Sequence, residues 1–123
     1  MHISYLPFNK GAHPNFWSFI KKTPKGVSIH EINKGIDDGG IIARKKVNFK
    51  LNNNSTFTNT YQKLIIEVEN LFKRNIKKII NNKYKFIRVY SKGSFHKKKD
   101  LPKDLINWNM VIKKYLKKTK LNL

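Results

Sequence analysis

A long stretch of regularly spaced apolar residues most restricts what this chain can fold into. Between Thr60 and Asn81 the apolar side chains recur at spacings of three and four, at Leu64, Val68, Leu71, Phe72, Ile76, Ile79 and Ile80. This spacing places them on one face of an α-helix, and that face must be covered by another apolar surface. Asn59 followed by Gln62 resembles a capping box, so we expect the helix to begin there. The sequence therefore predicts a long amphipathic helix packed against a sheet.

Two stretches ahead of this helix have the composition of β-strands. Residues 27–32 alternate apolar and polar side chains, and residues 41–49 form the second strand candidate. A loop rich in Gly and Asp, residues 35–40, separates them, so we expect an antiparallel β-hairpin. Residues 14–22 begin with proline and end with lysine, which predicts a short helix.

The last third of the chain contributes less regular structure. Residues 84–90 indicate a short strand or an extended segment, and residues 101–118, led by Pro102, predict a C-terminal helix. The order of these elements is of the α/β type, but the strands are few. Since so small a sheet has open edges, we expect the fold to be incomplete as it stands.

The formal net charge of +20 is high for a chain of 123 residues. It favours attraction to nucleic acid or anionic lipid. However, 24 of the 27 basic residues are Lys, whereas specific phosphate and base recognition favours the planar fork of Arg. A basic nucleic-acid-binding module therefore remains an alternative. The absence of Cys, of a secretion signal and of an apolar run near ~20 residues predicts a soluble cytoplasmic protein without a membrane partner.

Few side chains are suited to catalysis. The four histidines, at positions 2, 13, 30 and 96, are too scattered to predict a metal site, so we expect none. The sequence also lacks a phosphate-binding Gly-x-x-x-x-Gly-Lys loop and a nucleophile elbow. These absences argue against nucleotide hydrolysis and acyl-serine chemistry.

An ordered set of short motifs remains. His-x-Ser-x-Leu-Pro occupies residues 2–7, Gly-Val-x-Ile-His residues 26–30, and Asp-x-Gly-x-Ile-Ile residues 37–42. In this order and at these intervals they resemble the 10-formyltetrahydrofolate-dependent formyltransferases. The resemblance implies an α/β fold, namely the C-terminal half of a Rossmann-like formyltransferase catalytic domain, with a β-hairpin, a long amphipathic helix and a C-terminal helix.

The resemblance also implies roles for individual residues. His2 and Asp37 match two members of the family's catalytic trio, and the third, an Asn, would fall one place before Met1. We therefore expect an N-terminally truncated chain, and its activity in this form stays open. Folate binding is implied for Gly35, Ile36, Asp38 and Gly39, and binding of the acceptor for Ser4, Gly11 and His30.

The residue types suit this chemistry. A primary amine attacks the formyl carbonyl, and the negative charge that develops on its oxygen needs nearby donors, such as an imidazolium. We expect His2 to be such a donor. We expect Asp37 to raise the charged fraction of the imidazole and to accept or relay the proton of the amine.

The resemblance extends to domains and partners. It implies a partial catalytic domain over residues 1–82 and a C-terminal extension over 83–123, with 10-formyltetrahydrofolate as the formyl donor and no metal. Residues 92–100 resemble a Gly-Ser/Thr-Tyr-His-x-x-x-Asp segment of some family members. The expected acceptor is a nucleotide-linked amino sugar, and the alternative is methionyl-tRNA. A homodimer and an inactive fragment also remain open.

Overall fold

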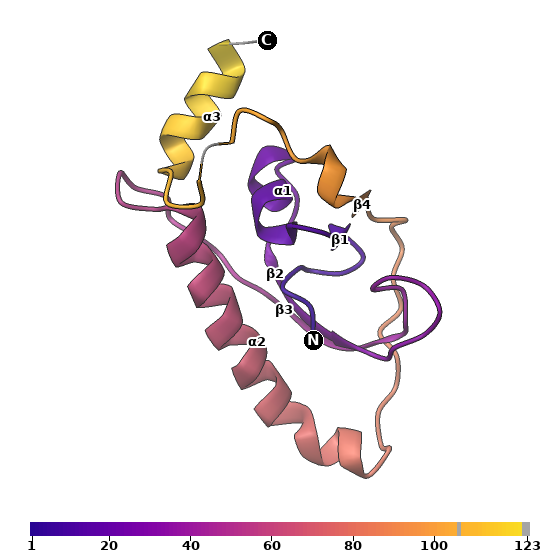
Figure 1. The fold of residues 1–123 in the computed structure, drawn as a ribbon. Helices are drawn as coiled ribbons and strands as arrows, with labels where there is room; N and C mark the ends of the chain where they lie inside the picture. Colours follow the sequence, from indigo (N-terminus) through magenta and orange to yellow (C-terminus); the bar gives the residue numbers. More distant parts are fainter. Residues whose placement is uncertain (106, 122–123) are drawn as a thin grey trace.

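The computed structural model describes residues 1–105 and 107–121. Helices and strands follow one another in this part of the chain as β1 (Lys10–Gly11), α1 (Pro14–Ile20), β2 (Gly26–His30), β3 (Ile41–Lys46), α2 (Phe57–Ile80), β4 (Phe95–His96), the 3₁₀-helix η1 (Lys98–Asp100) and α3 (Ile112–Leu121) (Figure 1).

Two small sheets organise the described residues. β2 and β3 pair antiparallel, with Gly26 opposite Lys46 and Ser28 opposite Arg44, which confirms the predicted hairpin. The N-terminal segment joins β2 through an isolated antiparallel bridge between His2 and Ser28. β1 and β4, more than eighty positions apart in sequence, pair in parallel. The chain thus returns, after α2, to the segment that follows its N-terminus.

Helix α2 runs diagonally beside the hairpin (Figure 1). Its apolar side chains form one core cluster with the hairpin, made of Val27, Ile29, Val47, Leu64, Val68 and Leu71. The predicted apolar face is buried as far as Leu71; beyond it Phe72 and Ile79 are only partly buried against the same cluster, and Ile80 is 73% exposed. With 24 residues α2 is about 36 Å long, whereas the six residues of β3 span only about 20 Å. Neither α2 nor any other described helix is long and apolar enough to cross a membrane.

The start of α2 differs from the prediction. The helix begins at Phe57, and Thr56 is its N-cap. The Thr56 hydroxyl accepts a hydrogen bond from the Asn59 amide, and the Asn59 side chain accepts one from the Thr56 amide. Asn59 is therefore the last residue of a capping box, at helix position N3, rather than its cap. The apolar spacing located the helix but did not locate its cap.

A second core cluster lies between α1, the start of α2 and α3. It consists of Phe16, Trp17, Phe19, Phe57, Ile112 and Tyr115. Phe49, in the connection between β3 and α2, packs against both clusters. Helices α1 and α3, from opposite ends of the chain, therefore pack in one cluster, and Phe49 joins that cluster to the one beneath the hairpin.

The C-terminal prediction was wrong in extent. The last helix begins at Ile112, and among residues 101–105 and 107–111 the structure has turns and an isolated bridge from Val111 to Thr56. Residues 84–90 form no regular strand and contact the hairpin through one backbone hydrogen bond, from Ile87 to the carbonyl of Ile41 (2.8 Å). Of the two predicted alternatives, a short strand or an extended segment, residues 84–90 form the extended segment.

We predict that α2 stabilises the fold through its buried face. Leu64 is 1% exposed in the cluster shared with the hairpin. Replacing it (Leu64→Ala) should lower the free energy of unfolding by about 2–5 kcal/mol, because the truncation leaves a cavity. Ile66→Ala, on the same helix and 58% exposed, is the matched control and should change it little. Urea denaturation followed by circular dichroism measures both, and equal losses would contradict the packing described above.

Candidate active site

Ser28, in the middle of β2, fixes the N-terminal segment. Its amide and carbonyl exchange hydrogen bonds with those of His2, both at 2.9 Å. Its hydroxyl donates to the Ser4 carbonyl (2.7 Å) and accepts from the Leu6 amide (3.0 Å). Ser28 is fully buried, so these four bonds form away from water. Residues 2–6 are thereby held along one edge of β2.

The loop after β2 brings Asp37 to the two histidines of this edge. Asp37 Oδ2 lies 3.5 Å from His2 Nδ1, and Asp37 Oδ1 lies 3.5 Å from His30 Nε2. The Gly11 amide donates to Asp37 Oδ2 at 2.9 Å. Asp37 itself adopts a left-handed backbone conformation with φ 53°, which Asp tolerates better than most residues. The residues assigned to catalysis, His2 and Asp37, are therefore brought together by the fold.

The ring of His2 is oriented by a second contact. Its Nε2 donates to the carbonyl of Asn9 at 3.0 Å. Burial lowers the pKa of His2, and this effect outweighs the opposing effects of the Asn9 hydrogen bond and the Asp37 charge. We expected Asp37 to raise the charged fraction of the imidazole. It does act in that direction, but desolvation of the ring is larger, so the ring is neutral at neutral pH.

The four residues assigned to folate lie on the loop between β2 and β3. The Gly35 amide donates to the Asn33 side chain, and Ile36 is exposed. The Lys10 ammonium pairs with Asp38 and lowers the pKa of that carboxyl. Gly39 passes so close to the Glu31 carbonyl that a Cβ there would collide with its oxygen, at 1.7 Å. Gly39 is thus required by the loop itself.

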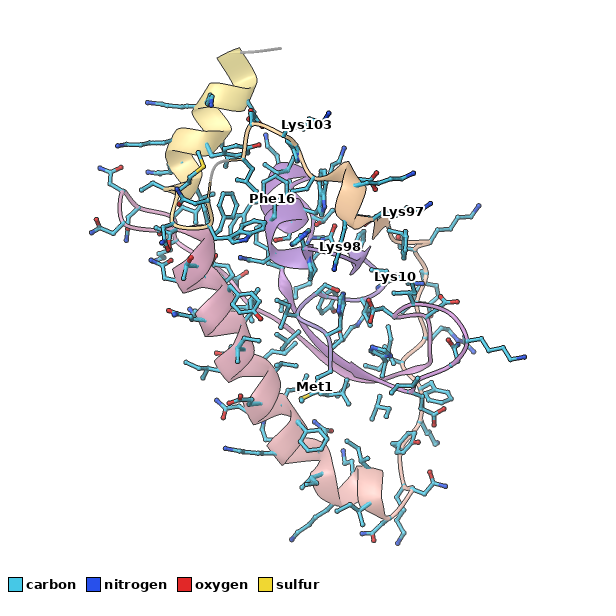
Figure 2. All side chains as sticks on the ribbon, in the orientation of Figure 1. Met1, Lys10, Phe16, Lys97, Lys98 and Lys103 are labelled. Atoms are coloured by element: carbon cyan, nitrogen blue, oxygen red, sulfur yellow. The ribbon has the colours of Figure 1, made fainter. Side chains whose placement is uncertain are left out.

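This loop forms one wall of an open groove of about 580 Å³. The residues that line it come from the loop and from the segment that contains β4: Lys10, Lys34, Gly35, Ile36, Asp38, Lys92, Gly93, Ser94 and Phe95. Lys10 belongs to β1, which pairs with the segment leading to Lys97 and Lys98 (Figure 2). The groove carries three lysines and one carboxylate, so it favours anionic groups.

The three residues assigned to the acceptor have different surroundings. His30 contacts Asp37 through Nε2, and its Nδ1 donates to the Glu31 carbonyl at 2.8 Å. Gly11 adopts φ 89°, and a Cβ there would lie 2.3 Å from the carbonyl oxygen of His96. Ser4 is 3% exposed, and its hydroxyl has no hydrogen-bond partner among the described residues. Gly11 and His30 therefore contact Asp37 directly, whereas Ser4 belongs to the buried edge beside β2.

Sequence reasoning missed Asn9, which is fully buried beside His2. No motif singled it out. The Gly-Ser-x-His segment that contacts it, Gly93 to His96, was noted only as a resemblance, and its Ser94 and His96 both bond Asn9.

A second hollow, of about 300 Å³, lies between α1, the start of α2 and Trp108. Its walls contain none of the residues assigned above, and aromatic side chains dominate them. Within residues 1–105 and 107–121, no three His, Cys, Asp or Glu side chains gather as metal ligands. The site around Asp37 presents the imidazole groups of His2 and His30 and one carboxylate.

Comparison with known proteins identifies the wider family. No family model matches the chain. The solved structure of the formyltransferase PseJ from Anoxybacillus kamchatkensis, in complex with UDP-4,6-dideoxy-4-formamido-L-AltNAc and tetrahydrofolate, is 42% identical, has a TM-score of 0.83, and is matched over 92% of this chain and 61% of that one.

Two curated relatives agree with this match. The bifunctional polymyxin resistance protein ArnA of Wigglesworthia glossinidia brevipalpis is 31% identical over 89% of this chain and 17% of its own length. The methionyl-tRNA formyltransferase of Prochlorococcus marinus subsp. pastoris is 32% identical over 81% of this chain and 30% of its own length. The chain thus spans less than a third of either relative. Its fold is part of a Rossmann-like α/β catalytic domain, and the chain belongs to the formyltransferase family.

Proposed function

We propose that this chain supplies part of the active site of an enzyme that transfers a formyl group from 10-formyltetrahydrofolate to the primary amine of a nucleotide-linked amino sugar. We assign residues 1–82 to the catalytic domain and residues 83–123 to a C-terminal extension. The observation that carries the proposal is that two histidine nitrogens and the Asp37 carboxylate, all hydrogen-bond acceptors, face one another.

These acceptors are Nδ1 of His2, Nε2 of His30 and the carboxylate of Asp37. Each imidazole donates its other nitrogen to a backbone carbonyl, that of Asn9 for His2 and that of Glu31 for His30. A carbonyl only accepts, so in the neutral rings the nitrogens that face Asp37 are unprotonated. Both lie 3.5 Å from the carboxylate, too far for a strong direct bond. A primary ammonium, with three N–H donors, complements this arrangement.

The same arrangement provides a base for the proton that the ammonium must lose before it can attack. An amine attacks only after losing its positive charge, and a neutral His2 beside Asp37 can accept that proton at Nδ1. The amine nitrogen then forms a bond to the formyl carbon and gives its second proton to the Asp37 carboxylate, which releases it to solvent, while the bond from that carbon to the folate nitrogen breaks. The protonated Nδ1 donates to the formyl oxygen while charge develops there, and it returns the proton to the departing folate nitrogen.

The groove beside Asp37 supports the assignment of the folate. Its glycine-containing wall permits close approach to the backbone, and Lys10, Lys34 and Lys92 complement the carboxylates of folate. We therefore assign Gly35, Ile36, Asp38 and Gly39 to folate, and Gly11 and His30 to the acceptor. Ser4 stays a prediction.

An amino-sugar acceptor is supported by the match to PseJ, whose structure contains a formamido sugar nucleotide. Methionyl-tRNA is the second acceptor to be tested, because several relatives bear that enzyme's name and 24 Lys residues favour RNA. Turnover with methionyl-tRNA, and none with UDP- or dTDP-linked 4-amino sugars, would reverse this choice.

We predict that Asp37 is essential for formyl transfer. Asp37→Asn removes the charge that pairs with both histidines, so formyl transfer should fall by on the order of 10²–10⁴-fold. Asp104→Asn is the matched control, because Asp104 is exposed, lies in neither the groove nor the contacts around Asp37, and accepts a hydrogen bond from the Tyr115 hydroxyl (3.2 Å). Release of tetrahydrofolate, followed by absorbance, measures the rate. Calorimetry of tetrahydrofolate binding gives a second readout.

Two outcomes would contradict the proposal. One is equal activity of the Asp37→Asn and Asp104→Asn variants. The other is an unaltered chain that neither turns over any amine acceptor nor binds tetrahydrofolate.

We also predict that His2 titrates below its ordinary pKa of 6.5, because burial disfavours the charged ring. Asp37 raises this pKa and His30 lowers it. Asp37→Asn should therefore move the midpoint further down, and His30→Gln should move it up. NMR of the imidazole nitrogens as a function of pH measures each midpoint. Shifts of the same sign in both variants would show that these charges do not act on His2 as the geometry indicates.

A further inference from the structure

Asn9 contacts three separate segments of the chain. It is 0% exposed, and its φ of 59° is left-handed. Its amide donates to the Ser94 hydroxyl (2.8 Å), and its side-chain Nδ2 donates to the Thr23 hydroxyl (2.8 Å). Its side-chain Oδ1 accepts from Ser94 (3.3 Å) and from His96 (3.1 Å), and its carbonyl accepts from His2 (3.0 Å). We call these contacts the Asn9 junction.

The junction determines which nitrogen of His2 carries hydrogen. The carbonyl of Asn9 can only accept, so Nε2 is the protonated nitrogen of the neutral ring. Nδ1 is then the nitrogen that gains and loses a proton, and it is the one 3.5 Å from Asp37. If the Asn9 carbonyl turned away, the ring would be free to adopt the other tautomer and would carry hydrogen on the nitrogen that faces Asp37.

The side chain of Asn9 holds its backbone in this orientation. Nδ2 is taken by Thr23, so Oδ1 is the atom that faces Ser94 and His96. The ring of His96 is itself fixed, because it stacks on Trp17 with centroids 4.4 Å apart and planes 11° from parallel. Three side chains from two other segments thus fix the side-chain amide of Asn9.

The backbone on either side of Asn9 is tied to the same distant segment. The Lys10 amide donates to the Ser94 carbonyl and the Ala12 amide to the His96 carbonyl, both at 2.9 Å. The Ser94 amide donates to the Pro7 carbonyl at 3.2 Å. Since these bonds form away from His2, they restrict the carbonyl of Asn9 without contacting the reacting groups.

We propose that Asn9, together with residues 94–96, is a positioning element that holds His2 in the Nε2-protonated tautomer and directs Nδ1 toward Asp37. The inference rests on the proposed function in naming His2 and Asp37 as the reacting pair. Asn9 is a positioning residue, because it acts on the substrate only through His2. The segment around β4, outside the residues assigned to catalysis, thereby becomes part of the active site.

The test uses two variants and one control. Asn9→Gly removes the side-chain contacts, and glycine accepts the left-handed backbone without strain. Ser94→Ala removes one hydroxyl from the opposite side of the junction. Ser91→Ala is the matched control, because among the described residues the Ser91 hydroxyl accepts only from the Gly93 amide, within its own turn.

Long-range ¹H–¹⁵N NMR of the histidine rings above neutral pH reports the tautomers without folate or amine. In the unaltered chain and in Ser91→Ala, His2 and His96 should both carry hydrogen on Nε2. In Asn9→Gly and Ser94→Ala, the two nitrogen shifts of His2 should converge, as for a ring that exchanges between tautomers. Formyl transfer should fall in the same two variants and not in Ser91→Ala.

An Nδ1-protonated His2 in the unaltered chain would overturn the inference. So would an unchanged His2 tautomer in Asn9→Gly and Ser94→Ala when their amide spectra are folded. If Asn9→Gly does not fold, Ser94→Ala decides alone, since it removes a single hydroxyl. A correct tautomer with no transfer to any amine would instead contradict the proposed function and leave the positioning role intact.

Discussion

The pairing of the N-terminal segment with β2 is the contact on which the rest of the site depends. Ser28 makes it through two backbone and two side-chain hydrogen bonds, all buried. Leaving any one of these groups unpaired in the interior would cost about 1–3 kcal/mol, so the alignment is strongly specified. The alignment decides where His2 lies, and His30, two residues beyond Ser28, lies on the same strand. One strand therefore positions both imidazoles.

The position of Asp37 follows from the same pairing. Its loop leaves β2 directly after His30 and returns as β3, so its length keeps the carboxylate near the strand end. The Gly11 amide then holds Asp37 Oδ2 at 2.9 Å. A hydrogen bond from a backbone amide to a carboxylate is charge-assisted, and this one is partly buried. The pair between Lys10 and Asp38 is exposed to solvent and contributes little by comparison. The loop is thus held mainly through Asp37.

Much of the local structure could be predicted, and the errors have identifiable causes. The period of the apolar residues gave α2, and the glycine-rich loop gave the hairpin, because both depend on contacts close in sequence. The start of α2 was misplaced because Thr56 and Asn59 bond reciprocally, an arrangement that the Asn59–Gln62 spacing imitated. The C-terminal helix was predicted too long because residues near Trp108 pack as turns: the Trp108 carbonyl accepts from the Thr58 amide, so tertiary contact overrode the helical spacing.

The sequence by itself determined the types of the main elements and the hairpin, and its motifs singled out His2 and Asp37 as candidates for the reacting groups. Only the tertiary structure showed which ring nitrogens of His2 and His30 face Asp37, and that Asn9 contacts His2. These depend on hydrogen bonds between residues up to 87 positions apart and on how far each ring is buried. Periodicity and motif spacing describe neighbours along the chain. The tautomer of an imidazole, by contrast, is set by whichever carbonyl the folded chain brings to it.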